Sequence, residues 1–299
     1  MSSPARDEPA LQSSPELGLT PQELQALVER ALAEDLGSGD ITSRLTIPEE
    51  LTGKCELTAK QELVVAGLPV AQEVFRSLSP AIEFLPLAAE GALAAARTPL
   101  ARVTGKTRVL LAGERVALNF LQRLCGIATF TRRLKSRLAG LTSELLDTRK
   151  TTPGLRALEK YAVRVGGGRN HRLRLDDGIL IKNNHLALAG GIRAAVERVR
   201  AGRPTLHIDL PIEVEVRSLA ELDEAIAAGA DALLLDNMTP DEVRACVIAA
   251  AGRARLEVSG GVNAENIRAY AETGVDCISV GALTHSAPAA DIHFLIQPM

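Results

Sequence analysis

The 299-residue sequence has few aromatic side chains: no Trp, two Tyr and five Phe, or 2% of the chain. This scarcity argues against a nucleic-acid-binding protein that stacks bases on aromatic platforms. The formal net charge is −3, which provides no global basic field for a polyanion. Apolar residues make up 46% of the chain, enough to bury a core of Leu, Val, Ile and Ala. Any preference for a charged ligand must therefore come from local charge.

The sequence also lacks paired cysteines and long apolar runs. Because the four cysteines lie far apart, no CxxC metal or redox motif exists, and we expect buried thiols in a reducing cytoplasm. No run reaches the ~18 apolar residues of a membrane span, so no membrane partner is expected. Residues 1–18 are rich in Ser, Pro and Glu and are predicted to be a disordered tail without a signal peptide. The cysteines are Cys55, Cys125, Cys246 and Cys277.

The pattern of apolar residues divides the chain into two kinds of structure. Residues 20–105 read as short strands and helices, beginning with a helix capped by Thr20, and residues 107–138 read as one long helix. Later strands end near residues 215, 236, 259 and 281, at spacings of 21, 23 and 22 residues, and two more are predicted at 144–148 and 178–182. Apolar strands that alternate with helices predict a parallel sheet. About six such units indicate an incomplete α/β barrel, with an open doubly wound sheet as the alternative.

Active sites of α/β barrels lie at the carboxyl ends of the strands. The segment 149–185 contains nine Lys or Arg and three acids, a local charge of +6. Some of these cations flank the glycines 166–168, where we expect the backbone to approach a ligand. Arginines at such ends suit carboxylates and phosphates, which they hold with two hydrogen bonds. The polar residues at the predicted strand ends are Arg149, Lys150, Lys182, Glu215, Asp236, Ser259, Gly260, Gly261 and Gly281.

Two smaller signals accompany this charge. Glycine-containing turns at 259–261 and 280–282 follow the last two strands, where barrels often bind a phosphate with backbone N–H groups. Glu215 and Asp236 could act as an acid/base pair, as Mg²⁺ ligands or as acceptors for sugar hydroxyls, and a neighbouring phosphate favours Mg²⁺. Glu213 lies two residues before Glu215, so the two side chains are expected on the same face of the strand, and the sequence does not show which of them serves the site.

The sequence resembles the quinolinate phosphoribosyltransferase family over about residues 20–297. The motifs that carry the resemblance are GDIT (39–42), GERVALNFLQRLCGIAT (113–129), DTRKTTPGLRALEKYAVRVGGGRNHR (147–172), DGILIKNNH (177–185), EVEV (213–216), LLDNM (234–238), SGG (259–261) and SVGALTH (279–285). The resemblance implies an α/β protein with an N-terminal α/β sandwich domain (19–118 with 286–299) and a six- to seven-stranded TIM-like barrel (119–285). It implies a homodimer or higher homo-oligomer that uses Mg²⁺ to convert quinolinate and 5-phosphoribosyl 1-pyrophosphate to nicotinate mononucleotide, pyrophosphate and CO₂ in NAD biosynthesis.

The resemblance also implies roles for individual residues. Lys150, Lys182, Glu215 and Asp236 are the expected catalytic residues, and the last two are also the expected Mg²⁺ ligands. Arg115 is expected to complete the active site of the neighbouring subunit. The expected quinolinate pocket contains Arg149, Lys150, Thr151, His171, Arg172 and Lys182. The expected 5-phosphate site contains Ser259, Gly260, Gly261, Val280, Gly281, Ala282 and His285. The chain departs from the family at Asn183, where an acid is common, so no role is assigned to that position.

Three other functions are compatible with parts of this pattern. A related phosphoribosyltransferase could use nicotinate or another anionic ring, but the pair Arg149 and Arg172 suits the second carboxylate of quinolinate. A barrel aldolase would use Lys182 to form a Schiff base. A non-catalytic module would bind the phosphosugar without releasing pyrophosphate or CO₂.

Overall fold

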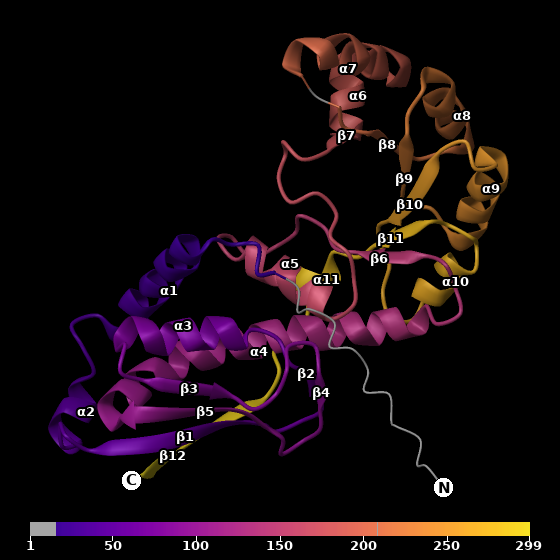
Figure 1. Cartoon of the computed structure of the whole chain (residues 1–299). Coiled ribbons are helices and arrows are strands. Elements are labelled where there is room, and N and C mark those ends of the chain that lie inside the picture. The colour runs from indigo at the N-terminus through magenta and orange to yellow at the C-terminus, as the bar shows by residue number, and fades with distance from the viewer. Residues whose placement is uncertain (1–15, 208) are drawn as a thin grey trace, which may run out of the picture.

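The computed structural model describes residues 16–207 and 209–299. Of the tail expected at 1–18, residues 1–15 lie outside the described residues, whereas Leu17 is half-buried against the core, so the expected boundary at 18 is too late. Two sheets lie on either side of one long helix, α4 (Thr107–Arg137) (Figure 1). Two glycines inside α4 allow neighbouring segments of the chain to pack closely against this helix. A Cβ on Gly126 would lie 2.1 Å from the Pro288 carbonyl oxygen, and one on Gly113 would lie 2.7 Å from the Phe75 ring. The predicted domain boundary at 118/119 falls inside α4 and stays a prediction.

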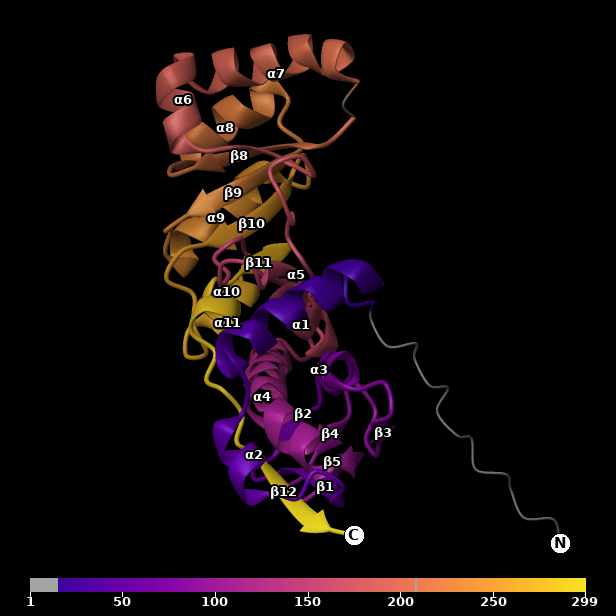
Figure 2. The ribbon, with the colours of Figure 1, turned by 90° about the vertical axis from the view of Figure 1, so that its left-hand side faces the viewer.

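The N-terminal part contains an antiparallel sheet of strand order β12-β1-β5-β3. Alternate residues of β1, Cys55, Leu57 and Ala59, are buried on one face. The last strand returns from the far end of the chain and pairs with β1 from Gly53–Pro298 to Ala59–Ile292 (Figure 2). The elements are α1 (Pro21–Leu36), α2 (Ile41–Thr46), β1 (Thr52–Ala59), β2 (Leu63–Val64), α3 (Leu68–Leu78), β3 (Glu83–Pro86), β4 (Leu93–Ala94), β5 (Pro99–Lys106) and β12 (Ile292–Pro298).

The C-terminal part contains a parallel sheet of strand order β6-β11-β10-β9-β8-β7. Successive strands lie side by side and the first pairs with the last, which is the order of a barrel and not of a doubly wound sheet. No ladder joins β6 to β7 in the described residues, so the barrel is incomplete, as predicted. The strands are β6 (Glu144–Leu146), β7 (Ile179–Ile181), β8 (Ile212–Val216), β9 (Ala232–Asp236), β10 (Arg255–Ser259) and β11 (Cys277–Ser279).

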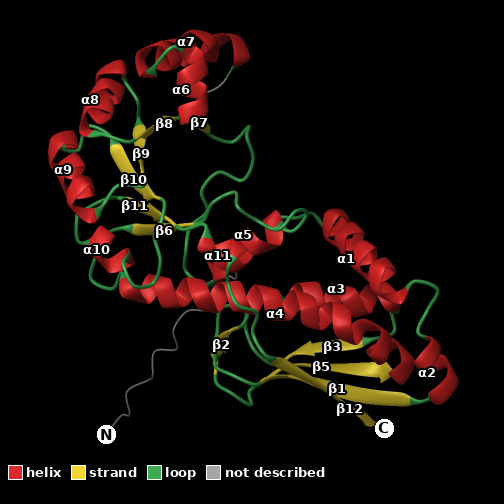
Figure 3. Ribbon diagram, turned by 180° about the vertical axis from the view of Figure 1, so that it is seen from behind, coloured by secondary structure: helices red, strands yellow, loops and turns green. Residues whose placement is uncertain are grey.

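Helices α7 to α10 stand along the outer side of this curved sheet, while α5 and α11 lie near α4 (Figure 3). The predicted cap at Thr20 is confirmed: its side chain accepts a hydrogen bond from the Glu23 backbone N–H, and Glu23 closes the capping box. Thr239 and Glu242 form the same arrangement at the start of α9. The helices are α5 (Arg156–Val165), α6 (Asn183–Ala189), α7 (Ile192–Leu206), α8 (Leu219–Ala228), α9 (Pro240–Ala250), α10 (Ile267–Ala271) and α11 (Ala282–His285).

One expectation from composition is confirmed in this fold: all four cysteines are free and buried. Among the described residues, no helix combines the length and apolar character needed to cross a membrane.

Candidate active site

A cavity of about 420 Å³ opens at the carboxyl end of the parallel sheet. It gathers residues from five strands and from the loop after α5, which lie more than 100 positions apart in the sequence. The structure therefore brings most of the predicted site into one place. The predicted residues that line it are Arg149, Lys150, His171, Arg172, Lys182, Glu215, Asp236, Ser259, Gly260 and Gly261.

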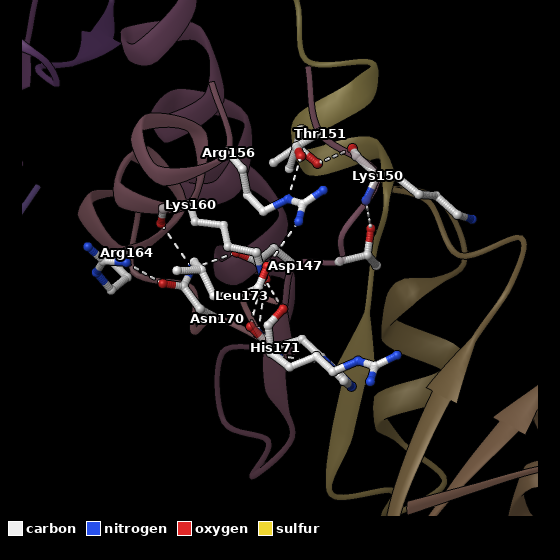
Figure 4. Close-up of polar contacts among 12 residues, drawn as sticks. Asp147, Lys150, Thr151, Arg156, Lys160, Arg164, Asn170, His171 and Leu173 are labelled. Atoms are coloured by element: carbon white, nitrogen blue, oxygen red, sulfur yellow. Dashed lines mark hydrogen bonds and ion pairs between the residues drawn. The ribbon is translucent and has the colours of Figure 1, made fainter. Parts of the chain in front are cut away.

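Six predicted residues do not line this cavity. Gly281 lies next to it, because a Cβ there would be 2.9 Å from Lys150 Cδ and 3.1 Å from His285 Nε2. The hydroxyl of Thr151 accepts a hydrogen bond from Arg156 Nε at 3.0 Å (Figure 4). Arg115 lies on an exposed face of α4. The predicted residues outside the lining are Arg115, Thr151, Val280, Gly281, Ala282 and His285.

Within the described part of the chain, two arginines of the cavity form no ion pair with an acid. Arg149 Nε is buried and has no hydrogen-bond partner among the described residues. Arg172 donates from Nη1 to the Gly178 carbonyl at 2.9 Å. Burial and the nearby charge of Arg149 both lower the pKa of Arg172. Two guanidinium groups held together in this way form a site for an anion.

The cations of the segment 149–185 fall into two groups. Most of them are used inside the chain: Lys160 Nζ, fully buried, contacts Asp147 Oδ1 at 2.5 Å. None of the glycines 166–168 lines the cavity, so the expectation that their backbone approaches a ligand there is wrong. A Cβ on Gly166 would lie 2.5 Å from the Ala128 carbonyl oxygen, so this glycine allows α5 to end against α4. The other cations bound inside the chain are Arg156, Arg164, Arg169 and Arg174.

The Asp147–Lys160 ion pair holds in place the loop that carries His171 and Arg172, two residues of the expected quinolinate pocket (Figure 4). Asp147 Oδ1 also accepts from the His171 backbone N–H at 2.9 Å, and Lys160 donates to the carbonyls of His171 and Arg172 at 2.8 and 3.2 Å. Burial raises the pKa of Asp147 and lowers that of Lys160, while their mutual attraction opposes both shifts. The pair thus fixes the backbone from which Arg172 reaches the cavity.

The two predicted metal-binding acids have neighbours that orient them. Glu215 Oε1 accepts from the side-chain amide of Asn183, and from its backbone N–H at 3.4 Å. Asp236 Oδ1 accepts from Asn237 Nδ2 at 3.0 Å, and its Oδ2 lies 3.5 Å from Arg217 Nε. The amide at position 183 thus donates to Glu215, which a carboxylate could not do. Both acids present oxygen atoms, the ligand type that Mg²⁺ prefers.

A third group of titratable side chains lies inside the barrel. His171 Nε2 is 3.2 Å from Glu213 Oε2 and 3.6 Å from Glu257 Oε2. His171 Nδ1 accepts the backbone N–H of Arg172 at 2.7 Å, so the ring proton of the neutral imidazole lies on Nε2. Because metal binding by Nε2 needs a free lone pair, this arrangement does not suit a metal centre. Both ring nitrogens are thus engaged within the chain.

The buried Glu257 favours its neutral form. Its Oε1 has no hydrogen-bond partner among the described residues, and burial together with the charge of Glu213 raises its pKa to about 7. Burial lowers the pKa of His171, but the two carboxylates outweigh it and raise the pKa overall. The hydrogen bond from the Arg172 backbone N–H to Nδ1 opposes that rise in pKa, because Nδ1 of a protonated imidazole has no lone pair left to accept it.

A larger cavity of about 660 Å³ opens at the amino end of the same sheet. Of the residues that line it, Arg255 donates to Glu144, the first residue of β6, whereas His171, Arg172 and Glu257 also line the cavity at the carboxyl end. Asp231 accepts the Ile212 backbone N–H at 2.7 Å. Size alone therefore does not identify the site. Arg172 lines both cavities, but Arg149, Lys150 and Lys182, which form no ion pair among the described residues, line the cavity at the carboxyl end and not the larger one.

Comparisons with known proteins agree with this geometry. Residues 127–295 match the model of the quinolinate phosphoribosyl transferase C-terminal domain, and residues 40–125 match that of its N-terminal domain. The chain belongs to the quinolinate phosphoribosyltransferase family. The family and fold class predicted from the sequence are therefore confirmed.

Individual relatives match the chain almost end to end. It is 43% identical over 272 residues to a probable carboxylating nicotinate-nucleotide pyrophosphorylase of Synechocystis, covering 90% of this chain and 91% of the relative. A Bacillus subtilis protein of the same description is 42% identical over 270 residues, covering 90% and 92%. The crystal structure of NadC from Streptococcus pyogenes is similar at a TM-score of 0.89 and 39% identity, covering 94% of this chain and 99% of that one.

Sequence reasoning missed Glu257 and Asn237 near the quinolinate phosphoribosyltransferase cavity, and noted Asn183 only as a departure from the family. Glu257 lies inside an apolar strand, two residues before Ser259, so its side chain points to the same face, and this was the available signal. Asn237 gave no comparable signal. A Cβ on Gly260, where φ is +97°, would lie 2.2 Å from Asn237 Oδ1.

Proposed function

We propose that the cavity at the carboxyl end of the parallel sheet transfers the phosphoribosyl group of 5-phosphoribosyl 1-pyrophosphate to the ring nitrogen of quinolinate. Family membership assigns the chain to the decarboxylating pentosyltransferases of NAD biosynthesis, with nicotinate-nucleotide pyrophosphorylase activity. The observation that carries the residue-level proposal is the buried, unpartnered Nε of Arg149 beside Arg172. This donor and this positive charge need an anion.

Quinolinate supplies two carboxylates on adjacent ring carbons. Arg149 and Arg172 bind them, and Lys150 and Lys182, which follow β6 and β7, add positive charge. His171 lies at the edge of this pocket with both ring nitrogens already engaged. We therefore assign it to shaping the pocket beside Arg172 instead of contacting a carboxylate.

The phosphosugar lies on the other side of the cavity. The backbone at Gly260 and Gly261 has φ values of +97° and +65°, which lets a phosphate approach a surface without side chains. Gly281 and His285 extend this surface next to Lys150. The oxygen atoms of Glu215 and Asp236 fit Mg²⁺, which would neutralise charge on the pyrophosphate when bound. The same acids orient the ribose hydroxyls.

The chemistry follows from this placement. The ring nitrogen attacks the anomeric carbon as its bond to pyrophosphate breaks, through an oxocarbenium-like transition state. The lysines stabilise the charge that develops on the leaving group. The ring nitrogen is then positive, so it stabilises the electron pair left at C2 when CO₂ departs. That carbon takes up one proton, and no base that abstracts a proton is required.

The oligomeric state and location are part of the same proposal. We propose a homodimer in which Arg115, exposed on α4 and outside its own cavity, reaches the cavity of the partner. The separated, buried cysteines favour the cytoplasm.

A CO₂-release assay with carboxyl-labelled quinolinate, the phosphoribosyl donor and Mg²⁺ tests the proposal. We expect release that requires all three and yields equal amounts of nicotinate mononucleotide and pyrophosphate. Nicotinate in place of quinolinate is expected to give little product. Turnover of nicotinate without CO₂ release would instead favour the related phosphoribosyltransferase, and borohydride trapping of a carbonyl substrate on Lys182 would favour an aldolase.

A further inference from the structure

A second buried ion pair lies outside the cavity and takes no direct part in the reaction. Glu159 of α5 has a fully buried side chain, and Arg123 of α4 is one-quarter exposed. Arg123 Nε and Nη2 both donate to Glu159 Oε1, at 3.0 and 2.8 Å. A buried carboxylate is costly unless its remaining lone pairs are also satisfied, so its other partners show what the pair holds in place.

Those partners belong to the two loops that border the cavity. Glu159 accepts from the backbone N–H of Thr152 at 3.0 Å and from its hydroxyl at 2.8 Å. Arg123 donates to the carbonyl of Thr284 and, at 3.2 Å, to that of Ala287. The hydroxyl of Thr284 in turn donates to the Lys150 carbonyl at 2.8 Å. One ion pair thus binds the loop 148–152 and the helix α11 to each other.

These two loops carry the groups that face each other across the phosphate site. Lys150 Cδ and His285 Nε2 lie about 3 Å from the position of a Cβ on Gly281, so both side chains pack over this glycine. Building on the proposed function, we infer that Arg123 and Glu159, with Thr284, are positioning residues that set the spacing between Lys150 and the Gly281–His285 turn. The spacing determines the affinity for 5-phosphoribosyl 1-pyrophosphate, which neither Arg123 nor Glu159 touches.

The choice of side chains supports this inference. An Arg provides five N–H donors in a fixed plane, enough to serve a carboxylate and two carbonyls at once. A Lys has three donors on one atom and reaches fewer of these acceptors. The hydroxyl of Thr284 is the single side-chain link from α11 to the Lys150 carbonyl among the described residues. Arg123→Lys and Thr284→Val therefore weaken the link, whereas Thr284→Ser keeps the hydroxyl.

The experiment measures binding without turnover. Benzene-1,2-dicarboxylate resembles quinolinate but lacks the ring nitrogen that attacks, so the donor can be titrated calorimetrically into protein saturated with it and Mg²⁺. We expect Arg123→Lys and Thr284→Val to raise the Kd of the donor roughly tenfold, below the ~100-fold that a 1 Å misplacement can cost. The Kd of the dicarboxylate should rise clearly less, by about two- to threefold, because Arg149 and Arg172 bind its carboxylates and Lys150 only adds charge nearby, and Thr284→Ser should behave as wild type.

Two further variants separate positioning from simple destabilisation. Arg102→Lys, which alters an Arg–Glu pair in the N-terminal sheet, is the matched control and should leave both Kd values unchanged. Arg123 lines a cavity of about 150 Å³ between α1, α4 and α5, which gives free guanidinium a route to its position. Guanidinium should therefore restore donor affinity to Arg123→Ala but not alter the wild type.

The inference is overturned if Arg123→Lys lowers the Tm while the donor Kd stays at the wild-type value, or if both ligands lose affinity equally. Failure of the proposed function has a different signature. In that case wild-type protein releases no CO₂ from quinolinate, while the calorimetric comparison still measures whether the pair controls donor binding.

Discussion

The two ends of the parallel sheet contain similar numbers of charged side chains and use them differently. At the amino end, Glu144 is bonded to Arg169 and Arg255, and Asp276 accepts the Leu256 N–H at 2.8 Å. At the carboxyl end, none of the ion pairs in the described residues involves Arg149, Lys150, Arg172 or Lys182. The cations that hold the fold are paired with acids of the chain, whereas these four cations assigned to the ligand are not. The acid Asp236, with Arg217 Nε at 3.5 Å, does not follow this rule. The pairing state, more than charge or cavity size, identifies the functional end.

The largest effect is expected from removing one unpaired arginine. Arg149→Ala or Arg172→Ala should weaken quinolinate binding about 100-fold, because losing one partner of a buried charge pair costs ~2–5 kcal/mol. Donor binding should change only a few-fold. Calorimetric titration of each ligand separately provides the measurement.

The matched control lies at the amino end. Arg255→Ala removes a half-exposed ion-pair partner, so it should cost about 1 kcal/mol of stability or less and leave both affinities near wild type. Equal losses of quinolinate and donor affinity in Arg149→Ala would contradict the assignment. A similar loss in Arg255→Ala would remove the distinction between the two ends.

A second experiment asks whether the carboxyl end is completed by another chain. Arg115→Ala and Lys150→Ala chains should each be inactive alone. Mixed after unfolding and refolding, they should regain about a quarter of wild-type activity, since half of the dimers are mixed and each restores one of its two sites. Heterodimers that form but remain inactive would show that Arg115 acts within its own subunit or not at all.

The sequence predicted much of the carboxyl end because the ends of parallel strands are set by a regular period. Strand ends at Glu215, Asp236 and Ser259 follow from spacing and converge once the sheet curves. The family resemblance added Arg172 and His171, which lie in a loop and have no period. Sequence reasoning could not assign roles to residues that act through contacts with distant segments. Asn183 is one of them, because its side-chain amide donates a hydrogen bond to Glu215, 32 positions away.

The charge of +6 counted over residues 149–185 was only partly informative, because a sequence does not show which cations contact acids elsewhere in the chain. Counting cations does not reveal that Lys160 is fully buried against Asp147 or that Arg169 bonds Glu144. The glycines 166–168 were misread because a sequence does not show that Gly166 packs against the backbone of α4. Contacts between segments far apart in the chain decide which charges and glycines are structural.

The smallest effect concerns Glu257, which lines both cavities and therefore belongs to neither end alone. Its pKa is raised from 4.5 to about 7 by burial, so the folded protein holds a proton that the unfolded chain releases. This stability is fully present below pH 4.5 and is lost as pH rises through about 7. The loss is at most ~3 kcal/mol, since one pKa unit corresponds to ~1.4 kcal/mol. The Gln side chain of Glu257→Gln is neutral at every pH, so this variant should not show the loss of stability as pH rises.

Calorimetric Tm values between pH 5 and 8 measure this difference. The Tm of Glu257→Gln should fall less than that of the wild type, by a few degrees at pH 8. Glu144→Gln is the control from the amino end. Partial burial raises the pKa of Glu144, but Arg169 and Arg255 lower it by more, so its contribution is lost only as pH falls below about 4.5. Between pH 5 and 8 its Tm curve should run parallel to that of the wild type. A parallel curve for Glu257→Gln as well would mean that Glu257 is ionised in the folded barrel, with His171 Nε2 at 3.6 Å as its partner, and that burial between the two cavities does not neutralise it.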